Sequence, residues 1–144
     1  MICHTHFERQ GVDLDKSHRV IDADWCKELA PGGPYFTVSY REGGVNLPEI
    51  ETLVYLGSTR LDDESGQSKA HFMFQLASSY QKHGDWSELP ESQRADLASD
   101  AEVMFYAEDN VGGIAEIDGL LVLLNGLRKC MRRGLGWGHT LPEQ

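Results

Sequence analysis

The clearest hydrophobic pattern in this 144-residue chain lies between residues 49 and 80. Two apolar runs, EIETLVYLGSTR and AHFMFQLASSY, flank a polar segment rich in Asp, Ser and Gly. Runs of β-branched and aromatic residues separated by turn-forming residues predict two neighbouring strands. In the second run every second residue from Ala70 to Leu76 is apolar, which predicts one buried face and an antiparallel sheet covered on that side.

The chain after residue 34 predicts more strands and two main helices. Further strands are expected at Tyr35–Arg41 and Glu102–Ala107, and Ile114–Ile117 is expected to be either a short strand or a segment that leads into the next helix. The most regular helical spacing covers 118–133, with Asp118 as N-cap and an apolar face that can cover a sheet. A shorter helix near 90–99 has one large apolar residue, Leu97. We therefore predict an α+β fold: an antiparallel sheet of about four to five strands, one long C-terminal helix packed on one face, expected to cover Phe72, Phe74 and Leu76, and a short peripheral helix.

Both ends of the chain have weaker patterns. Residues 1–34 are expected to be irregular, apart from a short helix that Asp22 or Asp24 caps and that runs to Leu29. The Gly-rich tail, 135–144, is expected to be extended. The length fits a single domain, 1–144. The longest apolar run has five residues, far below the ~20 needed to span a bilayer, so no membrane segment is expected.

Charge is unevenly distributed along the chain, whose formal net charge is −10. Residues 85–118 contain ten acids and a single base, Arg94, so this segment carries −9. Such a field opposes binding to nucleic acid, which requires neutralisation of phosphates, and favours a basic protein partner. The expected partner-binding residues are Asp85, Glu88, Glu91, Asp96, Asp100, Glu108 and Asp109. Plain solubility explains the same charge.

Metal and redox chemistry receive little support. His4 and His6 would share a face of a strand and form half of a zinc site, but no second ligand pair has a suitable spacing. No metal or other cofactor is therefore expected. Three sparse cysteines argue against a disulfide framework, and the first ten residues do not resemble a secretory signal. These features predict a cytoplasmic protein.

One strand face carries polar residues suited to a small ligand. Tyr55, His71, Met73 and Gln75 are expected to lie on the face opposite the aromatic one, with Arg41 and Tyr35 as neighbours. An open sheet face with these groups can bind a polar molecule or transfer a proton. The alternative interpretation is that they form the wet side of the sheet, or lie beneath a helix with their polar groups satisfied.

Two hypotheses of function follow. The chain has no Gly-x-Ser-x-Gly nucleophile motif, and its acids have irregular spacing, which favours a protein without catalytic activity. The leading hypothesis is a protein-binding module, such as an inhibitor of the antitoxin or immunity kind, that offers an acidic surface to a basic partner. The alternative is a small-molecule-binding or hydrolytic domain that uses Tyr55, His71 and Gln75. Self-association through a sheet edge, or through Trp86 and Trp137, is a third possibility.

Overall fold

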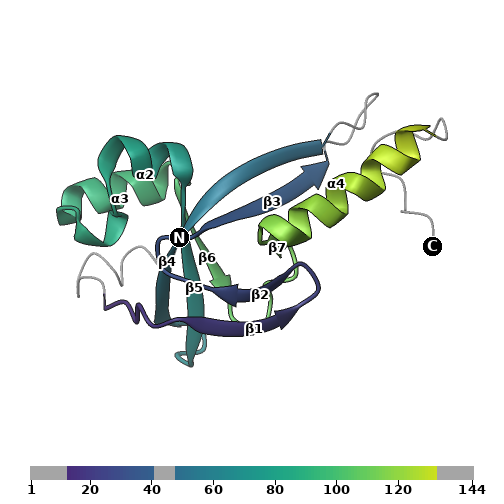
Figure 1. Cartoon of the computed structure of the whole chain (residues 1–144). Coiled ribbons are helices and arrows are strands. Elements are labelled where there is room, and N and C mark those ends of the chain that lie inside the picture. Colours follow the sequence, from purple (N-terminus) through teal and green to yellow (C-terminus); the bar gives the residue numbers. More distant parts are fainter. Residues whose placement is uncertain (1–12, 41–47, 133–144) are drawn as a thin grey trace.

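The computed structural model describes residues 13–40 and 48–132, and this part of the chain has an α+β fold (Figure 1). The strands are β1 (Arg19–Ala23), β2 (Cys26–Leu29), β3 (Pro34–Tyr40), β4 (Pro48–Asp62), β5 (Ser68–Leu76), β6 (Val103–Ala107) and β7 (Ile114–Ala115). The helices are α2 (Ala77–His83), the 3-10 helix η1 (Trp86–Glu88), α3 (Glu91–Ser99) and α4 (Ile117–Arg132). Five strands form one antiparallel sheet in the order β6-β5-β4-β3-β7, and β1 and β2 form a separate hairpin. The predicted fold class is confirmed. The 135–144 tail lies outside the described residues.

The long strand β4 joins the two halves of the sheet. Its first half pairs with β3 and its second half with β5. The register with β5 shifts by one residue between Tyr55 and Gly57, so Leu56 is the extra residue of a β-bulge. Gly57 has a φ of +138°, a conformation that side-chain-bearing residues rarely adopt. It also allows a close approach, because a Cβ there would lie 2.8 Å from the carbonyl oxygen of Asp15.

The segment before β1 is attached to the sheet at this bulge. The backbone amide of Asp15 donates to the Ser58 carbonyl over 2.7 Å, and the Ser58 amide donates back over 2.9 Å. The hydroxyl of Thr59 donates to the carbonyl of Asp13 over 3.0 Å. The bulge therefore fixes the bend of β4 and also holds the N-terminal part of the described chain.

The β1–β2 hairpin covers the aromatic face of the sheet (Figure 1). Phe72 and Phe74 are buried in this layer, and Leu76 is partly buried beside them. The hairpin contributes Ile21, Cys26 and Leu29. We expected the C-terminal helix to cover this face, and that expectation is wrong. The chain enters α4 from β7, which pairs with β3 at the sheet edge, so α4 contacts β3 and β7.

The hairpin itself corrects a second expectation. The helix expected to run to Leu29 is strand β2, and Asp24 and Trp25 form the turn that leads into it. Cys26 and Leu29 are both buried, a three-residue spacing that resembles a helix in the sequence. The turn is held from outside, since the amide of Glu116 donates to the Trp25 carbonyl over 3.0 Å.

The opposite face of the sheet is covered by α2, η1 and α3. Met73 of β5 and Leu56 of β4 are buried there with Trp86 of η1 and Leu97 of α3. The Trp86 indole nitrogen donates to the Arg94 carbonyl over 2.9 Å, which ties η1 to α3. The sheet therefore has a buried layer on each side. None of the helices within the described residues has the length and apolar character needed to cross a membrane.

Candidate interaction site

The residues predicted to form an open ligand-binding face do not lie together. Tyr55 and Gln75 are both completely buried, but they belong to the layers on opposite sides of the sheet. His71 is partly buried, and its Nδ1 lies 3.0 Å from the carbonyl oxygen of Lys69. Arg41 lies outside the described residues. The expectation of one shared open face is therefore wrong.

The β-bulge is the physical reason. Asp62 pairs with Ser68, and an unbroken register from this pair would place Tyr55 opposite Gln75 and so on the same face, which is the face that we expected for both residues. The extra residue in β4 shifts the register, so Tyr55 stands opposite Phe74 and its side chain joins the aromatic layer.

Gln75 has a structural role in its layer. Its Nε2 donates to the Ser79 hydroxyl and to the Gly84 carbonyl, each over 3.1 Å. Its Oε1 accepts from the backbone amide of Trp86 over 3.0 Å. The side chain thus satisfies polar groups of the connection between α2 and η1, as buried polar groups usually require.

Tyr55 lies near a small polar cluster at the edge of the aromatic layer. Burial raises the pKa of its hydroxyl to about 12, although the charge of the neighbouring Arg19 works in the opposite direction. Arg19 donates to the Ser58 hydroxyl over 2.7 Å and forms an ion pair with Asp15. Within the described residues the Tyr55 hydroxyl has no hydrogen bond of ordinary geometry, although the nearby Ser58 hydroxyl also acts to lower its pKa. This tyrosine packs against Phe72 and Phe74.

The predicted acidic surface is divided into separate regions. Asp85 accepts from the Lys16 ammonium over 2.9 Å and from the Ser87 amide over 2.9 Å, so it caps η1. Burial works to raise the pKa of the Asp85 carboxyl, but the hydrogen bonds from Ser87 and Lys16 outweigh it and leave this pKa below its usual value. Glu88 lies 4.0 Å from the same lysine. Both acids therefore already have a basic neighbour.

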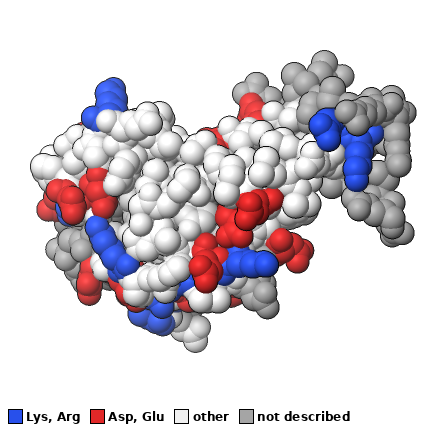
Figure 2. Space-filling view, in the orientation of Figure 1, with Lys and Arg blue, Asp and Glu red and all other residues white. Residues whose placement is uncertain are grey.

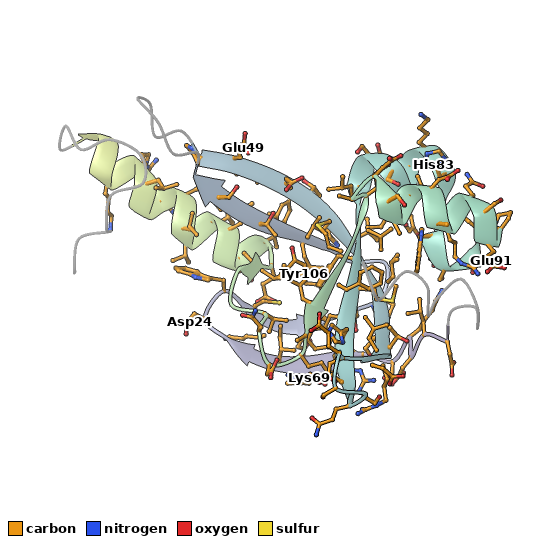
Figure 3. The ribbon with its side chains drawn as sticks, turned by 180° about the vertical axis from the view of Figure 1, so that it is seen from behind. Asp24, Glu49, Lys69, His83, Glu91 and Tyr106 are labelled. Atoms are coloured by element: carbon orange, nitrogen blue, oxygen red, sulfur yellow. The ribbon has the colours of Figure 1, made fainter. Side chains whose placement is uncertain are left out.

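The other predicted acids lie on two distant elements. Glu91 and Asp96 belong to α3, and Asp100 follows it. Glu108 and Asp109 lie in the turn after β6. Figure 2 shows acidic side chains in separate groups, with basic ones between them. In Figure 3, Glu91 lies on the helical side, whereas Lys69, whose ammonium is 3.9 Å from Asp109, lies near the end of the β4–β5 hairpin.

The two acids after β6 border a hollow of about 410 Å³, which we call the acidic hollow. It is lined by Val20, Ile21, Phe72, Val111, Glu108 and Asp109. Val20 is 80% exposed, which is the highest exposed fraction among the large apolar side chains on the surface of the described residues. The volume is within the range of about 300–1,000 Å³ found for ligand sites. Apolar walls beside two carboxylates suit a group that combines an aliphatic stem with a positive charge.

Sequence reasoning identified only part of the acidic hollow. Glu108 and Asp109 were among the predicted partner-binding acids, whereas Val20 and Ile21 were not assigned to any site. Their proximity depends on the β1–β2 hairpin lying across Phe72, and the sequence has no local signal for that packing. The isolated Gly57 inside a strand pattern is a recognised indication of a bulge, and it could have corrected the position of Tyr55.

Metal binding has no geometric support in this part of the molecule. Across residues 13–40 and 48–132, no three or more His, Cys, Asp or Glu side chains come together in a way that could hold a metal ion. His4 and His6 lie outside the described residues.

Comparison with protein-family models, curated proteins and solved structures finds no match to this chain.

Proposed function

We propose that this chain is a non-enzymatic protein-binding module that receives a basic segment of a partner protein at the acidic hollow. The observation that carries the proposal is the position of an exposed valine, Val20, beside two carboxylates at the rim of a ligand-sized hollow. Exposed apolar surface with a polar rim is typical of interaction sites.

The chemistry of the acidic hollow selects lysine or arginine from the partner. The aliphatic part of either side chain would pack on Val20 and Phe72, and its charge would lie near Glu108 and Asp109. Lys69 is the neighbouring base, and its ammonium is 3.9 Å from Asp109. Both side chains of that pair are more than half exposed, so the pair is weak and a better-placed cation can replace it.

The net charge of −10 would assist the encounter with a basic partner. Attraction of this kind raises the association rate and weakens as salt is added, because the charges are screened. Binding would block a partner that needs its basic surface for its own function. An inhibitor of the antitoxin or immunity kind would act in this way.

The proposal is tested by capture of proteins from a cell lysate on the immobilised chain at low and high salt. The first variant, Glu108→Gln with Asp109→Asn, removes two charges at the acidic hollow. The matched control, Glu91→Gln with Asp96→Asn, removes two charges on α3. We expect a protein retained at low salt by the wild type and by the control, but lost from the first variant. Equal retention by both variants, or no retained protein at low salt, would refute the proposal.

A further inference from the structure

We infer that the partner segment binds as an extended strand along the outer edge of β1, and so adds a third strand to the β1–β2 hairpin. This inference rests on the proposed function and adds the backbone geometry of binding. It begins from the position of the acidic hollow relative to β1.

The acidic hollow runs along one edge of β1. Val20 and Ile21 are consecutive residues of β1, and the pairing with β2 shifts its register between Val20 and Ala23. Ile21 is buried against the sheet, whereas Val20 is 80% exposed, so the two side chains lie on different faces of the hairpin. Both residues nevertheless line the acidic hollow, and no residue of β2 is among its lining residues. A hollow that reaches both faces of β1 without touching β2 lies at the edge away from β2.

That edge of β1 can accept a strand. Within the described residues, β1 pairs with β2 alone. In an antiparallel pair, alternate residues direct their N–H and C=O groups away from the partner strand. Such groups at an open edge are a template for strand addition, in which backbone hydrogen bonds supply affinity and side-chain pockets supply specificity.

The charge of the lining determines which strand fits. Glu108, Asp109 and Phe72 line the acidic hollow together with the two residues of β1. Side chains of an added strand alternate between its two faces, so every second residue of the partner would point towards Phe72. Basic residues at these positions would place aliphatic stems on the apolar lining and charges at the two carboxylates. The occupant is therefore an extended segment with lysine or arginine at alternate positions.

The probe for the test is a library of synthetic eight-residue peptides with lysine or arginine at every second position. Binding to the full chain is measured by fluorescence anisotropy at low salt, and the strongest binder is remade in two N-methylated forms. One form carries methyl groups on the odd-numbered amides, and the other on the even-numbered amides. Only one of these sets faces β1, so we expect one form to bind about tenfold more weakly and the other to bind like the parent peptide. Hydrogen exchange at the β1 amides should slow when the parent peptide is bound.

The results separate this inference from the proposed function. If both methylated forms bind like the parent, or both lose affinity equally, strand addition is wrong. The proposed function then still stands, provided that Glu108→Gln with Asp109→Asn weakens the parent peptide and Glu91→Gln with Asp96→Asn does not. If no basic peptide in the library binds, both the inference and the proposed function fail.

Discussion

Replacement of Gln75 by methionine tests whether this buried amide supports the fold. Gln75 is completely buried and makes hydrogen bonds to Ser79, Gly84 and the amide of Trp86. Methionine keeps the length of the side chain but removes these bonds. Loss of a partner costs about 1–3 kcal/mol for each buried group that is left unsatisfied, which here applies above all to the Gly84 carbonyl and the Trp86 amide. Methionine recovers about 1 kcal/mol through its apolar surface, so we expect a net loss of about 2–4 kcal/mol.

The assay is urea unfolding followed by tryptophan fluorescence, because Trp86 is buried next to the substituted residue. With a slope of about 2 kcal/mol per molar urea, the midpoint should fall by about 1–2 M. The matched control is Gln81→Met on the exposed side of α2, which should change stability by less than about 0.5 kcal/mol. An unchanged midpoint for Gln75→Met would refute the structural role and reopen the question of a ligand at this residue.

Three further substitutions or treatments test other parts of the structure. Gly57→Ala should lower the free energy of unfolding in urea by about 2–4 kcal/mol, because alanine rarely adopts this φ and its Cβ would contact the Asp15 carbonyl. The control Gly112→Ala, where a Cβ meets open space, should leave stability unchanged. Equal effects of the two substitutions would contradict the bulge. Tyr55→Phe should raise stability by about 1 kcal/mol at pH 7, since the hydroxyl is buried without a hydrogen bond among the described residues. Folding raises the Tyr55 pKa from 10.0 to about 12, so its contribution to folding stability is complete below pH 10 and is lost as the pH rises towards 12. Unfolding curves recorded across that range should show a smaller loss of stability for the variant than for the wild type. Burial raises the pKa of the Cys26 thiol to about 11 and leaves the thiol inaccessible. Mass spectrometry after iodoacetamide treatment at pH 8 should therefore find the Cys26 peptide modified only when urea unfolds the chain. Rapid labelling of the folded chain would contradict the burial of Cys26.

Much of the fold was predictable because local patterns determine it. The apolar alternation from Ala70 to Leu76, the strand patterns of β3 and β6, and the helical spacing of α4 all correspond to observed elements. The segment from Cys26 to Leu29 was assigned wrongly because two buried residues three apart suit a helix and a short irregular strand equally. Only the pairing with β1, which involves another part of the chain, decides between them.

The layers and the site were less predictable because they depend on register and on distant contacts. Strand alternation correctly separates Leu53 and Tyr55 from Val54 and Leu56 within β4. Alternation alone does not show which of these two pairs lies on the same face of the sheet as Phe74, since that depends on the single extra residue at the bulge. The acidic hollow depends in the same way on where the hairpin lies. The acids around it were found from charge alone, and their apolar neighbours were not.

The two-sided character of β5 has a consequence for how the protein unfolds. Phe72 and Phe74 belong to the layer beneath the hairpin, whereas Met73 belongs to the layer beneath the helices, so neighbouring residues of one strand hold both layers. If the helices detach, the reverse side of the same strand is exposed to water, and the hairpin loses the support of a well-ordered sheet. The two layers are therefore thermodynamically coupled through β5, and we expect them to melt in a single cooperative transition.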